Sequence, residues 1–194
     1  MHTLIFAAIA AASLGAAPDL KSTLTEAIQD EYRAEGTYRA VMMKFGEVRP
    51  FSNIIRAEQM HIRLVADLMG KYGYPVPVST FLQRKDETAA AFMVRMNVPD
   101  TFTGAAKQAV GVEESQIPFY NRLLKQTLPD DVRQVFVKLQ ADSRDRHLVA
   151  FRRFAGTSMK APPATSTAGA GAVKGAGAGC GSGCGPGGDA GCGG

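Results

Sequence analysis

The chain has 194 residues, of which 45% are hydrophobic, a formal net charge of +4 at pH 7 and three cysteines. This length and hydrophobic content suffice for one compact domain, while dispersed basic residues without a nucleic-acid motif argue against a nucleic-acid partner. No P-loop or dinucleotide-binding glycine pattern is present, so the common nucleotide-binding folds are not expected.

The chain begins with an apolar run. Residues Leu4 to Gly15 are apolar or small, and a charge-rich segment follows soon after them. The run is too short to span a bilayer comfortably and is typical of a secretory signal peptide, with cleavage near Gly15 to Ala17. We therefore expect residues 1–17 to be a signal peptide, no stable membrane span after its removal, and a periplasmic or secreted protein. A retained N-terminal anchor is the alternative, because no Lys or Arg precedes the run.

Residues 18–155 are predicted to be helical almost throughout. Apolar residues recur every three to four positions from Leu24 to Phe45, and Gly46 then provides a helix stop. A second helix is expected to begin at Arg49-Pro50 and to end at Gly70 and Gly73, because proline is favoured in the first helical turn.

The second half of this region predicts further helices. The segment from Thr80 to Val98 has a weaker helical pattern and is interpreted as a connecting helix. A third long helix starts near Thr101 or Thr103, and a fourth starts at Pro129 with acidic residues in its first turn. Long helices with one longer connection predict an all-α fold, a four-helix bundle with a connecting helix between helices two and three.

Glu58 and His61 are the first candidates for a site. They lie three residues apart in RAEQMHIRL, on a helix face shared with apolar residues. A carboxylate and an imidazole directed toward a core are costly unless a partner satisfies them. Iron or manganese would do so, since both accept carboxylate oxygen and imidazole nitrogen. This short motif alone is common and is more often a polar pair on a wet helix face.

The other helices add residues of the same kinds. Glu31 precedes Tyr38 by seven residues, which places both on one stripe of the first helix. The third helix repeats this spacing with Glu113 and Tyr120, and the fourth supplies His147. In ferritin-like di-metal bundles, two helices give one Glu each and two give Glu-x-x-His, a plan that this chain largely matches.

Four segments resemble the ferritin-like superfamily, and in particular its uncharacterised family called domain of unknown function 2202. They are DEYRAEGTYRAV, RPFSNIIRAEQMHIRLVADLMGKYGYPVP, GVEESQI and SRDRHLVAF, and the resemblance covers roughly Leu24 to Phe154. It implies a carboxylate-bridged di-iron or di-manganese centre used for ferroxidase, peroxidase or oxygenase chemistry. By position it implies as ligands Glu31, Glu58, His61, one or both of Glu113 and Glu114, and His147. Tyr38 and Tyr120 would be hydrogen-bonding partners of these ligands.

The fourth helix departs from that plan. Arg144 stands three residues before His147, where a Glu is expected, and Ser143 is the residue one turn below the histidine. Loss of a bridging carboxylate removes a charge that would help to neutralise two metal ions. One ion, two ions held asymmetrically with both Glu113 and Glu114, or a vestigial site therefore remain alternatives.

The C-terminal segment has a different composition. Residues 156–194 are rich in Gly and Ala, almost without large apolar side chains, and are predicted to be a disordered tail. All three cysteines, Cys180, Cys184 and Cys192, lie there without metal-ligand spacing. A tail-mediated disulfide between chains or a homodimer is left open.

Two functions of different classes follow. The first is an exported metalloprotein whose iron or manganese reacts with Fe(II), oxygen or peroxide, which would make it an oxidoreductase of ferroxidase or peroxidase type. The second is a non-catalytic exported bundle with a structural or vestigial metal site.

Overall fold

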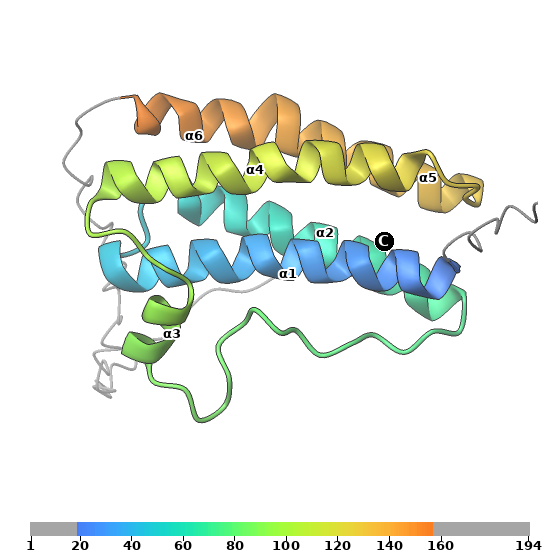
Figure 1. Cartoon of the computed structure of the whole chain (residues 1–194), viewed down its shortest axis with the longest axis horizontal. Helices are drawn as coiled ribbons and strands as arrows, with labels where there is room; N and C mark the ends of the chain where they lie inside the picture. The colour runs from blue at the N-terminus through green and yellow to red at the C-terminus, as the bar shows by residue number, and fades with distance from the viewer. Residues whose placement is uncertain (1–18, 157–194) are drawn as a thin grey trace, which may run out of the picture.

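Four long helical rods lie side by side in the computed structural model, which describes residues 19–156 (Figure 1). The fourth rod is composite, because α5, η1 and α6 follow one another without a break. No strand occurs in this part of the chain, and the predicted all-α bundle with a connecting helix is confirmed. The elements are α1 (Leu20–Phe45), α2 (Phe51–Lys71), α3 (Ala89–Arg95), α4 (Phe102–Leu124), α5 (Asp130–Asp142), the π-helix η1 (Ser143–His147) and α6 (Leu148–Ala155).

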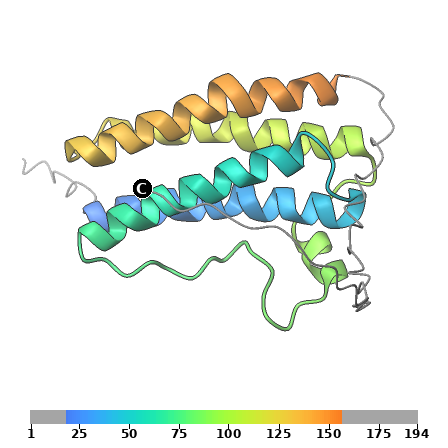
Figure 2. The ribbon, with the colours of Figure 1, turned by 180° about the vertical axis from the view of Figure 1, so that it is seen from behind.

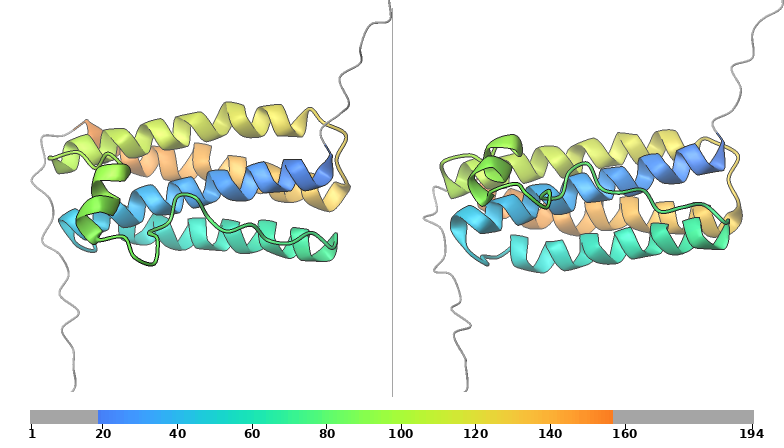
Figure 3. Two further views of the ribbon diagram at one scale, coloured as in Figure 1. Left: turned by 60° about the horizontal axis from the view of Figure 1, so that its bottom comes forward. Right: turned by 90° about the horizontal axis from the view of Figure 1, so that it is seen from below.

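The rods do not simply alternate in direction. α2 runs back along α1, whereas α4 runs in the same direction as α2 (Figures 1 and 2). Between these two parallel helices the chain returns along the whole bundle in a long connection that contains α3 (Figure 3). One long crossover of this kind is the ferritin-like arrangement.

Local sequence sets the helix ends. Asp19 caps α1, and its Oδ1 accepts a hydrogen bond from the backbone N–H of Ser22 over 2.8 Å. Gly46 ends α1 with a φ of 81°, a left-handed conformation that glycine adopts without strain. Thr101 caps α4 by accepting from the N–H of Gly104 over 3.0 Å. Of the two threonines expected to start the third long helix, Thr101 is therefore the cap.

The connection between α2 and α4 is less helical than predicted. The expected helix from Thr80 to Val98 is wrong in extent, since only Ala89–Arg95 is helical. The start is set by Thr88, whose side chain accepts from the N–H of Ala91 over 3.1 Å. Upstream, the connection lies so close to α1 that a Cβ on Gly36 would sit 2.6 Å from the carbonyl oxygen of Phe81.

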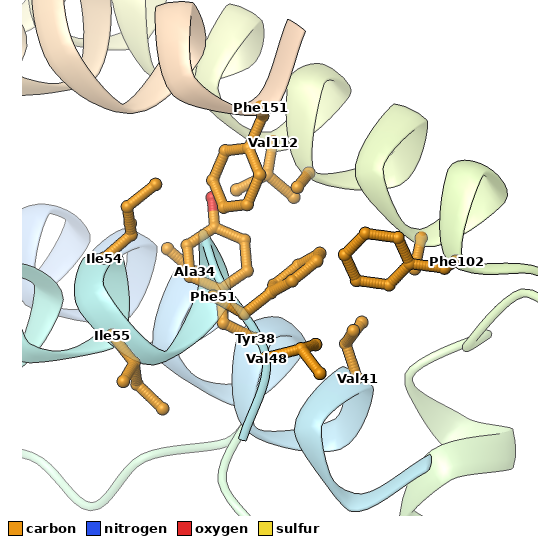
Figure 4. Packing of buried hydrophobic residues seen from close by; sticks show 12 residues of the cluster. Ala34, Tyr38, Val41, Val48, Phe51, Ile54, Ile55, Phe102, Val112 and Phe151 are labelled. Carbon is orange, nitrogen blue, oxygen red and sulfur yellow. The ribbon is translucent and has the colours of Figure 1, made fainter. Parts of the chain in front are cut away.

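The core consists of two apolar clusters along the bundle. One contains Tyr38, Phe51 and Phe151, whose rings pack at centroid distances of 4.9 to 5.8 Å (Figure 4). The other contains Tyr120 and Phe136 at 5.5 Å. Each rod contributes to both clusters and carries buried polar residues between its two contributions. The fold therefore encloses a polar layer between the two apolar clusters.

Some predictions fall outside the described residues. They are the signal peptide at residues 1–17 and all but the first residue of the tail, including Cys180, Cys184 and Cys192. Within residues 19–156, none of the helices combines the length and the apolar character that crossing a bilayer requires.

Candidate metal centre

The polar layer brings carboxylates and imidazoles from all four rods together. Its candidate ligands are at most 4% exposed and come from α1 (Glu31), α2 (Glu58, His61), α4 (Glu113) and the end of η1 (His147). Burial of this many ionisable groups is costly unless they pair with one another or hold an ion. The five side chains form two groups of three that share one residue.

The first group consists of Glu31, Glu58 and His61. His61 Nδ1 lies 3.2 Å from Glu31 Oε2 and 3.3 Å from Glu58 Oε2. One ligand atom from each of the three residues lies within 4.8 Å of the others. The i, i+3 spacing of Glu58 and His61 on α2 therefore places both on the layer.

The second group consists of Glu58, Glu113 and His147. His147 Nδ1 lies 2.9 Å from Glu58 Oε1 and 3.5 Å from Glu113 Oε1, and the same 4.8 Å limit holds. The two imidazole rings are stacked with centroids 5.5 Å apart. The two groups are thus adjacent, and each imidazole has a different oxygen of Glu58 beside it.

Several atoms of the second group have unused bonding capacity. Both oxygens of Glu58, Glu113 Oε2 and His147 Nδ1 are buried without a hydrogen-bond partner in the described structure. These atoms lie close to one another but are not aligned for hydrogen bonds. A metal ion bound between them would give each atom a partner. Carboxylate and imidazole together suit iron and manganese. The residues present therefore fit a metal ion.

Two tyrosines tie the groups across the bundle. Tyr38 of α1 donates a hydrogen bond to Glu113 Oε1 of α4 over 2.5 Å, and Tyr120 of α4 donates to Glu31 Oε1 of α1. Each hydroxyl thus binds the glutamate of the other helix. Burial and the adjacent carboxylate raise the pKa of both tyrosines, so that both hydroxyls keep their protons.

In the absence of a metal ion, three ionisable groups of the layer have raised pKa values. Burial, opposed by the hydrogen bond to His61 and reinforced by Glu58, raises the pKa of Glu31 to about 7. Burial alone would lower the pKa of His61, but its contacts with Glu31 and Glu58 outweigh this effect and raise it to about 11. The same balance with Glu113 and Glu58 raises the pKa of His147 to about 9. Without an ion, both imidazoles therefore keep a positive charge at neutral pH.

The π-helix η1 changes which residues face the layer. Ser143 is fully buried and donates to Gln116 Oε1 over 2.9 Å, whereas Arg144 is exposed and pairs with Asp145 at 2.7 Å. A π-helix has more residues per turn than an α-helix, and in η1 Ser143, four residues before His147, is buried while Arg144, three residues before it, is exposed. Arg144 consequently does not point at the candidate ligands, and a neutral Ser–Gln pair lies where the plan calls for a carboxylate.

The structure does not bring Glu114 to the layer. Its side chain is half exposed on α4 and pairs with Arg152 of α6 at 2.8 Å. Adjacent helical residues point about 100° apart, so Glu113 and Glu114 cannot both face the core. An asymmetric pair of ions held by both glutamates is therefore not supported by this arrangement.

One residue of the layer was missed from the sequence. Asp142 Oδ2 lies 3.2 Å from His61 Nε2, on the side of the ring opposite to Glu31 and Glu58. Its spacing of five from His147 is not a same-face spacing in an α-helix, which is why the pattern gave no signal. The π-helix that follows Asp142 changes the register, so that Asp142 at the end of α5 and His147 at the end of η1 are both buried.

Comparisons with known proteins agree with this fold. A crystal structure of hypothetical protein MJ0754 from Methanococcus jannaschii DSM 2661 matches with a TM-score of 0.59 and 25% sequence identity. The match covers 74% of this chain and 85% of that one. The comparison with curated proteins found no match to the chain. The family described as "Uncharacterized protein domain (DUF2202)" matches residues 24–159, most of the helical region. The chain belongs to the DUF2202 family.

Proposed function

We propose that this protein is an exported metalloprotein whose polar layer holds two iron or manganese ions and reacts with Fe(II), oxygen or peroxide. The observation that carries the proposal is the pair of buried Glu/His groups that share Glu58. One shared carboxylate with one oxygen toward each imidazole is the arrangement expected of a bridging ligand.

Each ion would have its own ligands and share one. Glu31 and His61 would hold the first ion, Glu113 and His147 the second, and Glu58 would bind both. The carboxylates supply three negative charges against four positive charges of two divalent ions. The site would therefore retain a net positive charge, which favours a negatively charged or electron-rich ligand such as an oxygen species.

The surrounding residues prepare the site for redox chemistry. Bound iron or manganese would supply one-electron chemistry with oxygen or peroxide. Tyr38 and Tyr120 keep Glu113 and Glu31 oriented through their hydrogen bonds. The two apolar clusters flank the layer and limit access of bulk water.

Metal loading of the full chain tests the proposal. Protein freed of metal by chelation is incubated anaerobically with Fe(II) or Mn(II), desalted and assayed for metal, and oxygen consumption is then followed with Fe(II). Wild type and Glu114→Gln are expected to retain metal and to consume oxygen above the rate of free Fe(II), whereas Glu113→Gln retains less metal. Glu114 is the matched control, since it is adjacent in sequence but exposed. Wild type that retains no metal contradicts the proposal.

A structural or vestigial site is the second candidate. It is favoured by the first group, in which His61 and both oxygens of Glu31 find hydrogen-bond partners without any ion. Metal retention with oxygen consumption no faster than that of free Fe(II) supports this candidate and rejects the oxidase function.

Export is part of the proposal and rests on the sequence. The apolar run from Leu4 to Gly15 supports a signal peptide. N-terminal sequencing of protein recovered outside the cytoplasm is expected to begin near Pro18. An intact N-terminus in a cytoplasmic fraction would contradict export.

A further inference from the structure

We propose that Asp142 is a positioning residue that fixes His61 for metal binding and that two surface cations adjust its effect on the bound metal. This inference rests on the proposed function, because it concerns the same site. It begins from the contact between Asp142 Oδ2 and His61 Nε2 at 3.2 Å, which no ligand plan for this chain requires.

The contact determines how His61 can be used. Its Nδ1 faces Glu31 and Glu58, so an ion between these carboxylates would bind through Nδ1. Nε2 then carries the proton and donates a hydrogen bond to Asp142. A carboxylate in this position fixes the ring orientation and makes the imidazole a stronger donor to metal.

Asp142 also links the buried imidazole to the surface. The side chain of Asp142 is 12% exposed, and its Oδ2 accepts a hydrogen bond from Lys138 Nζ over 2.5 Å. Arg146 lies 3.3 Å from Oδ1. Lys138 and Arg146 are 51% and 75% exposed, so their positive charges partly offset Asp142 from the solvent side.

The π-helix allows the rod that carries Asp142 to supply the candidate ligand His147 as well. Asp142 precedes η1, and His147 ends it. One rod therefore supplies a candidate ligand to the second group and an outer carboxylate to the histidine of the first. The irregular turn has a functional use in this account, since it allows both residues to face the layer.

The first test uses the metal-loaded full chain. Asp142→Leu is expected to weaken metal binding by about 10–100-fold, the range found for loss of such outer partners. In Asp142→Asn, the amide oxygen can still accept a hydrogen bond from the Nε2–H of His61, but the negative charge is lost. The midpoint potential of the bound metal should therefore rise. Lys138→Gln removes a positive charge that partly offsets the negative charge of Asp142, so the midpoint potential should fall. A purely structural role does not produce opposite shifts from these two variants.

Asp145→Asn is the matched control. It removes a carboxylate on the same rod whose side chain is 56% exposed and paired with Arg144, away from the candidate ligands. It should leave metal affinity and potential unchanged. Equal effects of Asp145→Asn and Asp142→Asn, or shifts of one sign in Asp142→Asn and Lys138→Gln, would overturn the inference.

A metal-free readout separates this inference from the proposed function. Nitrogen-15 spectra of histidine-labelled wild type should show a protected His61 Nε2 proton that exchanges faster in Asp142→Leu. Absence of metal retention in wild type rejects the proposed function, and the metal-based role of Asp142 with it. Metal retention with identical His61 exchange and affinity in wild type and Asp142→Leu rejects the inference alone.

Discussion

Tyr38 donates a hydrogen bond to Glu113 over 2.5 Å, although the two residues lie 75 positions apart in the sequence. This hydrogen bond joins α1 to α4, and a second one joins the same helices in the opposite direction, from Tyr120 of α4 to Glu31 of α1. The Glu–Tyr spacing repeated on the two helices thus gives two reciprocal hydrogen bonds between them. It places the two halves of the polar layer in a fixed register.

Removal of either hydroxyl is expected to destabilise the bundle. Tyr38→Phe leaves the buried Glu113 carboxylate without this donor and should lower the free energy of unfolding by about 1–3 kcal/mol, measured by urea denaturation of metal-free protein. Tyr120→Phe should act similarly through Glu31. Tyr72→Phe is the control, because Tyr72 donates to the half-buried Asp131, whose carboxylate is open enough for solvent to replace the lost bond. An equal loss in Tyr72→Phe would contradict the role assigned to burial.

The metal-free protein should become less stable as pH rises. The pKa of Glu31 rises from 4.5 to about 7 on folding, and that of His147 rises from 6.5 to about 9. Both groups bind more protons when folded, so stability falls between pH about 4.5 and 7 for Glu31 and between about 6.5 and 9 for His147. His61 acts in the same direction up to about 11.

Metal should reverse this trend, because ligands must lose their protons to bind it. Thermal unfolding with chelator and with metal, across the same pH range, measures both behaviours. Stability of the chelated protein that increases from pH about 5 to about 9 would show that these groups are not held as protonated pairs.

Arg144→Gln is expected to have no effect on metal binding, whereas a carboxylate introduced at position 143 should strengthen it. Arg144→Gln should leave the retained metal unchanged, because the side chain pairs with Asp145 in solvent. Ser143→Asp adds a buried fourth carboxylate, which should cost about 3–5 kcal/mol of stability without metal and increase metal affinity. Metal titration and denaturation of both variants provide the check. Tighter metal binding in Arg144→Gln would contradict this expectation, because it would mean that the arginine charge repels the ions.

Much of the fold followed from elementary patterns. The apolar repeat, Gly46 and a threonine cap at Thr101 or Thr103 placed the long helices, since these signals are local. The connection from residue 72 to 88 was harder, because its course depends on contacts with α1, such as the hydrogen bond from Gln29 Nε2 to the carbonyl oxygen of Val78. No short stretch of sequence encodes such a contact.

The candidate site was predictable where helix geometry is regular. Spacings of three and seven residues brought out Glu58 with His61 and the two Glu–Tyr pairs. Sequence could not show that the tyrosines cross between helices, since that depends on the packing of α1 against α4. Nor could it find Asp142, because the π-helix alters the register within a single turn.

We expect Glu58 to be shared by two metal positions, and the metal content of Glu58 and histidine variants measures this sharing. After loading with Fe(II) or Mn(II), the wild-type chain should retain about two ions, and His61→Ala and His147→Ala about one each. Glu58→Gln should retain neither ion firmly, with Glu114→Gln matching wild type. Circular dichroism confirms that each variant is folded. If Glu58→Gln retains as much metal as wild type, or if either histidine variant loses all of it, the account of two ions joined by Glu58 is wrong.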